Sequence, residues 1–242
     1  MSADLARLLA EVDAVLLDFD GPVCSVFAGY PARDVAADLV ELLDGQGIHP
    51  PPSLTTEQDP LEVLRWTGTA GDRVVTRLVE DALCAAELRA VEVAAPTPYG
   101  REVIVAARQA GLPVAIVSNN SAGAVSAYLV KHRLNGHVTS VVGRAYADPA
   151  RMKPSPEPIV RGAQILSTEP NRAVLIGDSK SDIEGGRAAG VRIIGYANRP
   201  AKADAFQRAG AEVIVTSMAP IAEALISRSE AGEEAATETS SV

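Results

Sequence analysis

The sequence is poor in residues that several common classes of protein require. Aromatic side chains make up only 4% of it, so platforms for stacking nucleic-acid bases are scarce. The net charge of −9 also disfavours binding to nucleic acid or to an anionic membrane surface. No apolar run approaches the length of a transmembrane helix. We therefore expect neither a nucleic acid nor a membrane as a partner.

Cysteines, histidine clusters and targeting signals are also scarce. The two cysteines, Cys24 and Cys84, permit one disulfide, but free thiols in a reducing cytoplasm are favoured because charged residues interrupt any apolar export signal near the N-terminus. The three histidines are scattered without the spacing of a metal site. No glycine-rich Walker loop is present, so an ATPase is unsupported. These absences predict a cytoplasmic protein that is neither an ATPase nor a protein with a histidine metal site.

The chain is organised around a short apolar segment that ends in two acids. Residues 14–18 have the sequence AVLLD, which is long enough for one buried strand, and Asp20 follows before Gly21 and Pro22 stop the strand. Two carboxylates at the end of a buried strand repel each other and are costly to desolvate, unless a cation lies between them. An acidic strand end that simply faces water is the alternative for this segment alone.

Two different periodicities divide the rest of the chain. Residues 24–95 carry helical patterns, with a break predicted at 67–71 and no strand pattern. Beyond them, apolar strands alternate with short helices, which predicts parallel βαβ units. We therefore expect an α/β protein whose doubly wound parallel sheet is formed by residues 1–23 and 96–228 around an all-helical insertion. Residues 229–242 are rich in Glu, Ala, Ser and Thr and are predicted to be a disordered acidic tail.

Two later segments place candidate anion-binding groups at the edge of the sheet where ligands bind in such folds. The predicted strand 114–117 is followed by Ser118 and Asn119, which offer a hydroxyl and free backbone N–H groups at the start of a helix. A simple helix cap is the alternative. Lys153 lies in a proline-rich segment just before a helix, so the backbone aims it, although a solvated loop lysine is also possible.

A second pair of acids follows another buried strand. Asp178 and Asp182 come after the predicted strand 173–176 and repeat the electrostatic problem posed by Asp18 and Asp20. Four carboxylates, one hydroxyl and one ammonium at strand ends suit a hard divalent cation together with a phosphate. Mg²⁺ takes oxygen ligands and is bound by a couple of carboxylates and a substrate phosphate. Lysine and backbone amides neutralise the remaining phosphoryl charge.

These four segments resemble the four ordered motifs of the haloacid dehalogenase-like superfamily. The matching segments are DFDGPV at 18–23, VSNN at 117–120, Lys153 with Pro154, and GDSKSD at 177–182. Each motif is short, but the set in this order is specific. The resemblance implies a Rossmann-like core, and a helical insertion directly after the first motif is typical of the branch with a small helical cap. That branch includes phosphoglycolate phosphatase-like enzymes and β-phosphoglucomutases.

The resemblance implies a catalytic or binding role for each motif residue. Asp18 would be the nucleophile that forms an aspartyl-phosphate, and Asp20 would protonate the leaving oxygen and then activate water. Ser118 and Lys153 would hold the phosphoryl oxygens, and Asn119 would also bind substrate. The acid at position 20 argues against the dehalogenase reaction itself, because true dehalogenases lack it.

The resemblance also implies a Mg²⁺ cofactor and its ligands. Asp18, Asp178 and the backbone carbonyl of Asp20 would hold the ion. Asp182 would either bind the metal directly or orient metal-bound water.

The cap is expected to select the substrate. The segment 64–69 resembles the substrate-specificity loop of this branch, which makes Arg65 and Thr67 candidate substrate-binding residues. Mutases are expected to carry a basic residue beside Gly68, where this chain has Thr67. The leading prediction is therefore a Mg²⁺-dependent phosphatase for a small phosphorylated metabolite, and a β-phosphoglucomutase-like phosphomutase is the nearest alternative.

Two alternatives from other functional classes share part of this residue set. A receiver-type signalling domain is also α/β with acids, Mg²⁺, a hydroxyl and a lysine, but the insertion after the first strand and the second acid of the DxD pair count against it. A non-catalytic domain that binds a phosphorylated ligand would be expected to lose at least one motif acid, and none is missing. The sequence specifies neither the substrate nor the oligomeric state.

Overall fold

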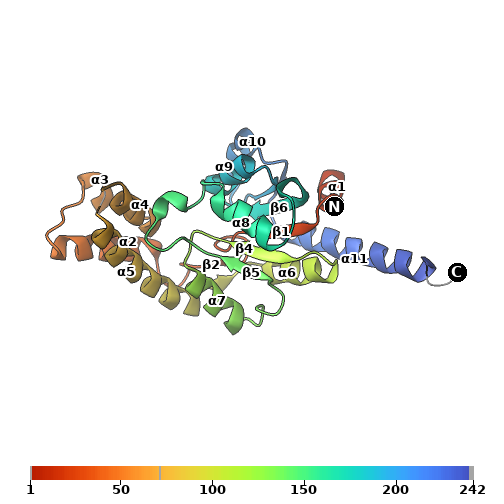
Figure 1. Ribbon diagram of the computed structural model, residues 1–242, viewed down its shortest axis with the longest axis horizontal. Helices are drawn as coiled ribbons and strands as arrows, with labels where there is room; N and C mark the ends of the chain where they lie inside the picture. The colour runs from red at the N-terminus through yellow and green to blue at the C-terminus, as the bar shows by residue number, and fades with distance from the viewer. Residues whose placement is uncertain (1, 71, 240–242) are drawn as a thin grey trace.

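A six-stranded parallel sheet lies at the centre of the computed structural model, which describes residues 2–70 and 72–239 (Figure 1). The strand order is β5-β4-β1-β6-β7-β8, so the chain order reverses on either side of β1. Ligands bind in such sheets outside the carboxyl ends of the strands at this reversal. The strands are β1 Ala14–Leu17, β4 Val114–Val117, β5 Ser140–Val142, β6 Ala173–Gly177, β7 Arg192–Tyr196 and β8 Val213–Val215. This topology confirms the predicted doubly wound, Rossmann-like fold.

Helices cover both faces of the sheet, which explains why its central strands are continuous apolar runs. Side chains alternate between the faces, so Val15 and Leu17 pack into one apolar cluster and Leu16 into another. The helices of this region are α1 Ala3–Ala10, α6 Gly100–Gln109, α7 Ala122–Lys131, α8 Glu157–Ile165, α9 Lys180–Ala189, α10 Ala201–Ala209 and α11 Ala219–Thr239, with short 3-10 turns η1 Pro149–Arg151 and η2 Pro170–Arg172. None of the helices in the described part of the chain has the length and apolar character needed to cross a bilayer.

Residues 24–95, which we call the cap, form a helical layer beside one end of the sheet (Figure 1). Its helices bury their own apolar cluster, which includes Leu39, Leu64 and Leu83. The helices are α2 Ala32–Gly45, α3 Pro52–Thr55, α4 Pro60–Ala70 and α5 Arg73–Glu92. The prediction that this region has no strands is wrong at its ends, because β2 (Cys24–Ser25) pairs antiparallel with β3 (Ala95–Pro96) where the cap joins the core.

The predicted break at 67–71 is also wrong for the residues that the structure describes, because α4 continues to Ala70. The sequence predicts a loop glycine at position 68, but Gly68 lies within this helix. A Cβ atom at position 68 would lie 2.4 Å from Pro149 Cγ in η1. The glycine is therefore explained by a close approach between the cap and the core, which local sequence does not reveal.

The predicted disorder of residues 229–242 is wrong for residues 229–239, which continue α11 as far as Thr239; the remaining three residues lie outside the described part. Ala and Glu favour helix, and a helix that has already begun needs no new nucleus. The start of this segment is also tied to the core. Arg228 Nη1 donates to the Val12 carbonyl at 3.0 Å, and Ser229 Oγ donates to the Gln109 carbonyl at 3.1 Å.

We expect deletion of residues 231–242 to leave the melting temperature within about 2 °C of that of the full chain. Among the residues whose side chains are described, the last buried apolar residue of α11 is Leu225. Thermal unfolding of the truncated protein measures this effect. Leu225→Ala is the positive control, because removing a buried leucine side chain costs about 2–5 kcal/mol and lowers the melting temperature by several degrees. An equal loss in the truncated protein would show that the distal tail contributes to the packing.

Candidate active site

Asp18, Ser118 and Asp178 come together because each follows one of three neighbouring strands. Leu17 lies beside Ile116 of β4 and Ile176 of β6 in the register of the sheet, so the residues after these positions emerge at one edge. They line a cavity of about 360 Å³ that also includes Asp20, Asn119, Lys153 and, from the cap, Asp59 and Arg65. The structure thus places side chains from all four sequence motifs around one cavity between core and cap.

Lys153 lies between two buried carboxylates. Its Nζ is 2.7 Å from Asp18 Oδ1 and 2.5 Å from Asp182 Oδ1, and it donates to the Val117 carbonyl at 2.8 Å. Burial raises the pKa of Asp18 well above its usual range, and the charge of Asp182 raises it further, while Lys153 acts in the opposite direction. Burial alone would lower the pKa of Lys153, but the two carboxylates raise it, so the ammonium stays charged.

Asp20 occupies a different environment from Asp18. Its Oδ1 accepts a hydrogen bond from the Val26 N–H at 2.9 Å, at the start of the cap. Burial raises the pKa of Asp20 to about 6, although the bond from Val26 acts against this rise. A carboxyl group with a pKa near neutrality can both donate and accept a proton at physiological pH, which is the property that a general acid and base needs.

Asp18, Asp178 and Asp182 each offer a carboxylate oxygen within 4.8 Å of the others. Asp178 is held from α10 and the loop before it: Lys202 Nζ and Asn198 Nδ2 donate to its Oδ2 at 2.7 and 2.9 Å. Such an all-oxygen donor set fits Mg²⁺, and the mutual repulsion that raises the pKa of Asp18 is what a bound cation would relieve.

Gly21 leaves room for the carboxylate of Asp178 at this position. The glycine has a φ of +110°, and a Cβ atom there would lie 2.2 Å from Asp178 Cγ. The loop after the first strand can therefore approach the Asp178 side chain closely only because it carries glycine.

The Asp20 carboxylate lies outside the cluster formed by Asp18, Asp178 and Asp182, so at position 20 only the backbone carbonyl is left as a candidate ligand.

Asp182 is fully buried, and protein donors reach both of its oxygens. Lys153 binds Oδ1, and Ser179 Oγ donates to Oδ2 at 2.6 Å within the capping box of α9. Burial alone would raise the pKa of Asp182, but Lys153 and Ser179 lower it. Of the two roles considered from the sequence, direct metal binding has the weaker geometric support, because both oxygens already accept hydrogen bonds. Asp182 instead contacts the Lys153 ammonium, which also lies 2.7 Å from Asp18 Oδ1.

The Asn119 side chain binds the backbone of the lysine segment. Lys153 N–H donates to Asn119 Oδ1 at 2.8 Å, and Asn119 Nδ2 donates to the Lys153 carbonyl at 3.1 Å. Ser118 Oγ lies 3.1 Å from both the N–H and the Oδ1 of Asn120, and the residue lines the cavity. Any contact of Asn119 with a ligand would therefore come from its main chain, while its side chain fixes the position of Lys153.

The two cap residues predicted to bind substrate differ in the structure. Arg65 lines the cavity, donates through Nη2 to the Lys153 carbonyl at 3.0 Å, and has its Nε 3.0 Å from Glu62 Oε1. The structure contradicts the prediction for Thr67, which is fully buried and donates to the Leu64 carbonyl at 2.7 Å. Because α4 continues through position 67, this side chain lies on the inner face of the helix, away from the cavity.

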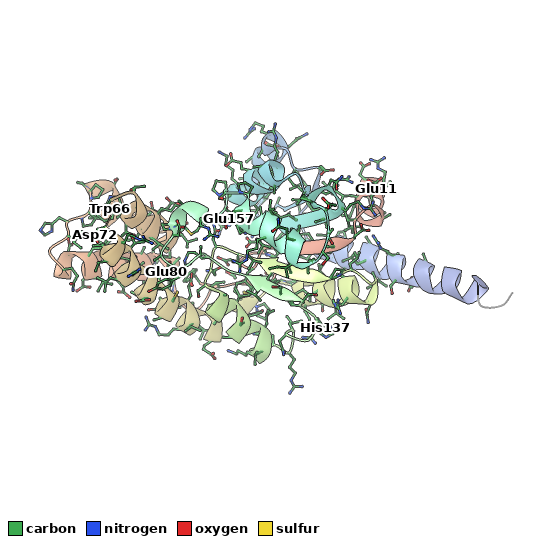
Figure 2. All side chains as sticks on the ribbon, in the orientation of Figure 1. Glu11, Trp66, Asp72, Glu80, His137 and Glu157 are labelled. Carbon is green, nitrogen blue, oxygen red and sulfur yellow. The ribbon has the colours of Figure 1, made fainter. Side chains whose placement is uncertain are left out.

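Sequence reasoning missed a buried ionic network that joins the cap to this site. Arg144 Nη1 lies 2.7 Å from Glu87 Oε1 and donates to the Asn119 carbonyl at 2.7 Å, and its Nε donates to Glu80 Oε1 at 3.0 Å. Glu87 also accepts a bond from the Ser121 N–H at 2.9 Å. All three ionic side chains are at most 2% exposed, and Glu80 lies on α5 (Figure 2). The network connects α5 to the loop after β4.

A sequence signal for this network existed on α5. Glu80 and Glu87 are seven residues apart, in the same helical stripe as the buried apolar residues Leu83 and Ala90. Acidic residues on the buried face of a helix require a cationic partner. Nothing local to Arg144 identifies it as that partner, since it lies 57 residues from Glu87 along the chain.

Comparison with known proteins finds a family model and relatives that are similar to this chain. Residues 78–196 match the family model described as haloacid dehalogenase-like hydrolase. A phosphoglycolate phosphatase from Aquifex aeolicus is 25% identical over 187 residues, which cover 74% of this chain and 81% of that protein.

Solved structures show the same fold. A HAD family hydrolase from Deinococcus radiodurans, whose structure contains bound phosphate and sodium, is 26% identical with a TM-score of 0.60, covering 90% of this chain and 97% of that one. A putative β-phosphoglucomutase from Bacteroides vulgatus is 17% identical with a TM-score of 0.66, covering 94% and 99%, and shares the fold alone.

Proposed function

We propose that this chain, which is similar to the haloacid dehalogenase-like hydrolases, is a Mg²⁺-dependent phosphatase that acts on a small phosphorylated metabolite. One observation carries the proposal: the buried carboxylate of Asp18 lies 2.7 Å from the ammonium of Lys153, in a cavity that Ser118 and Asp178 also line. A nucleophilic acid, a cation and a hydroxyl around one small cavity suit a phosphoryl group. The relative from Deinococcus radiodurans binds phosphate, which supports this ligand class.

In the first step, an oxygen of Asp18 attacks the phosphorus atom of the substrate. A bond forms between that oxygen and phosphorus, and the bond from phosphorus to the leaving oxygen breaks. Asp20 supplies the proton that the leaving oxygen takes up. Lys153 and Ser118 stabilise the charge that spreads over the phosphoryl oxygens, and Asp182 keeps the lysine in place.

In the second step, water attacks the same phosphorus atom while Asp20 accepts its proton. The bond between Asp18 and phosphorus breaks, which releases inorganic phosphate and restores the carboxylate. Asp18, Asp178 and the backbone carbonyl of Asp20 would hold Mg²⁺, which when bound supplies positive charge next to the phosphoryl group. The phosphoryl group and the protons that move in the cycle thus come from the substrate, one water molecule and residues of this site.

Residues of the cap would contact the organic part of the substrate. Arg65 and Asp59 line the cavity from the cap, opposite the motif residues. A volume of about 360 Å³ is at the small end of ligand pockets, which suits a metabolite of a few carbon atoms. The Aquifex aeolicus relative carries the name of an enzyme for phosphoglycolate, and that compound heads the list of candidates. A phosphate-release screen over phosphoglycolate, sugar phosphates and nucleoside monophosphates tests the proposal.

We expect phosphate release to cease in EDTA and to return with Mg²⁺ but not with Ca²⁺. Mg²⁺ imposes octahedral geometry at short distances, whereas Ca²⁺ accepts more ligands at longer distances and would displace the attacking oxygen of Asp18. Release of phosphate from the best substrate of the screen is measured after dialysis against EDTA and after return of each ion. Full activity in the dialysed, metal-free enzyme would refute the assignment of Asp18 and Asp178 as metal ligands.

A further inference from the structure

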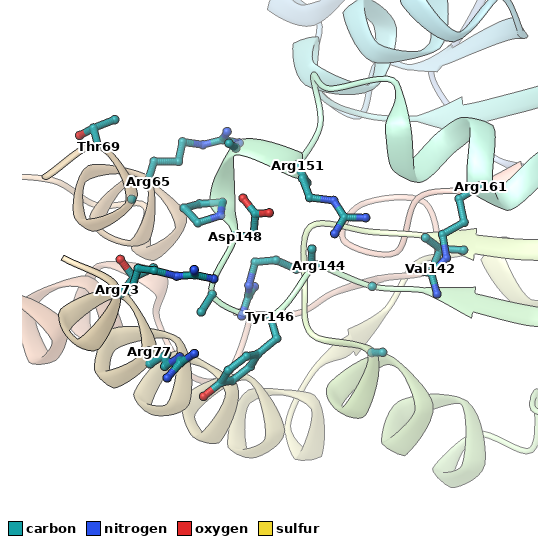
Figure 3. A pocket seen from close by; sticks show the side chains of 18 of the residues that line it. Arg65, Thr69, Arg73, Arg77, Val142, Arg144, Tyr146, Asp148, Arg151 and Arg161 are labelled. Atoms are coloured by element: carbon teal, nitrogen blue, oxygen red, sulfur yellow. The ribbon is translucent and has the colours of Figure 1, made fainter. Parts of the chain in front are cut away.

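A second and larger cavity lies between the cap and the core. Its volume is about 1,020 Å³, and residues of α4, α5, α8 and the segment 143–151 line it (Figure 3). Among the described residues, its lining shares only Arg65 with the lining of the candidate active site. Six arginines contribute to it, from both sides of the gap: Arg65, Arg73, Arg77, Arg144, Arg151 and Arg161.

Half of these arginines already have acidic partners. Arg65 pairs with Glu62, and Arg151 pairs with Glu157. Arg144 pairs with both Glu80 and Glu87. No ion pair is found for Arg73, Arg77 or Arg161 within residues 2–70 and 72–239. Asp148 is the sole acid that lines the cavity in the described part of the chain. The lining therefore keeps an excess of positive charge in a protein whose net charge is −9.

The arrangement of Arg73 and Arg77 is unfavourable without a ligand. The two residues are four positions apart on α5, a spacing at which like charges destabilise a helix. They also lie in its first two turns, where positive charge opposes the helix macrodipole. Arg161 adds a third positive charge from α8 on the core side of the same cavity (Figure 3). An anion in the cavity would offset positive charge that these three side chains bring to its lining.

We propose that this cavity is a second ligand site, which binds a small anion with two or more phosphate groups and thereby bridges cap helix α5 and core helix α8. Guanidinium groups bind phosphate oxygens through paired hydrogen bonds, and several of them can engage separate phosphate groups. The cavity is at the upper end of the usual range for small-molecule pockets, so it accommodates more than one such group. The exposed ring of Tyr146 on its wall adds an apolar surface for an organic part.

The site differs from the candidate active site in what it needs to bind an anion. The active-site cavity carries Asp18, Asp20 and Asp178, which repel an anion when no metal is bound. The arginine-lined cavity needs no metal. Loss of anion binding in variants of the arginine-lined cavity, measured in EDTA, therefore reports on the second site, whether or not the protein hydrolyses phosphate esters.

The test is calorimetric titration of the full-length protein in EDTA with methylenediphosphonate, a stable analogue of diphosphate. The exposed pair is changed in the double variant Arg73→Gln with Arg77→Gln. We expect the dissociation constant of this variant to be roughly tenfold or more above that of the wild type, because two charged hydrogen-bonding groups are lost. Orthophosphate, which has one phosphate group, should bind the wild type more weakly than the diphosphonate does.

The matched control is Arg33→Gln with Arg108→Gln, which removes the same charge from exposed positions that do not line the cavity. It should change the dissociation constant by less than a factor of about two. The diphosphonate should also raise the melting temperature of the control and of the wild type, but not that of the cavity variant. Equal weakening in both double variants, or no binding by the wild type at millimolar concentrations, would overturn the proposal.

Discussion

Replacing Asp18 by Asn is expected to lower phosphate release by at least ~10³-fold without unfolding the protein. An amide is a far weaker nucleophile than a carboxylate and a poorer ligand for a divalent cation. The new side chain can still accept the bond that Phe19 N–H donates to Asp18 Oδ1 at 2.7 Å. Lys153 keeps its second carboxylate partner, Asp182, so the charge of the ammonium remains compensated.

The stability of this variant should be equal to or higher than that of the wild type. Burial and Asp182 raise the pKa of Asp18 in the folded protein, so at neutral pH the ionised carboxylate is less favourable in the folded state than in the unfolded state. Asn removes that charge. Phosphate release and thermal unfolding are measured together, with Asp204→Asn on α10 as an exposed control. Turnover within tenfold of the wild type would exclude Asp18 as the nucleophile.

Arg144→Met should have the largest effect on stability among the variants considered. Removing the guanidinium leaves Glu80 and Glu87 buried beside each other without their cation, and breaking a buried ion pair in this way typically costs about 3–5 kcal/mol. The loop after β4 also loses the bond between Arg144 Nη1 and the Asn119 carbonyl. Denaturant unfolding gives the change in the free energy of unfolding.

Two further variants test whether the loss of stability in Arg144→Met comes from unpaired buried charge or from lost packing. Arg172→Met removes a pair with Asp13 in which both side chains are about half exposed, and it should lower the free energy of unfolding far less than Arg144→Met does. If Arg144→Met is too unstable to isolate, adding Glu80→Gln and Glu87→Gln should restore a folded protein, because the unpaired charges disappear. A loss for Arg144→Met no greater than that for Arg172→Met would show that the buried network contributes little.

The core motifs were predictable because their signals are local. Asp18 and Asp178 directly follow apolar segments that form buried parallel strands, and the carboxyl ends of neighbouring parallel strands meet at one edge. Lys153 was predicted from its proline-rich segment and from the family resemblance. In the structure Lys153 lies between Asp18 and Asp182, which are 135 and 29 residues from it along the chain. Local sequence cannot reveal contacts over such separations.

The cap and its contacts were less predictable because they depend on tertiary structure. Gly68 resembles a loop residue until the approach of Pro149 to α4 is known, and the same helix turns Thr67 inward. Arg144 resembles a solvated arginine, because its partners lie on another segment of the chain. Lys202 likewise reaches Asp178 from a helix that carries none of the four motifs. Pairings of this kind leave no periodicity in a single sequence.

The most direct test of a phosphorylated intermediate on Asp18 is mass spectrometry of the enzyme quenched in acid during turnover of acetyl phosphate with Mg²⁺. Acid slows hydrolysis of the acyl phosphate, and proteolysis then isolates the peptide that contains Asp18. We expect this peptide to gain the mass of one phosphoryl group, with fragmentation placing it on Asp18, and the Asp18→Asn protein to gain none. Phosphate release at full rate with no phosphoryl group on Asp18, or with the group on another residue, would contradict the proposed mechanism.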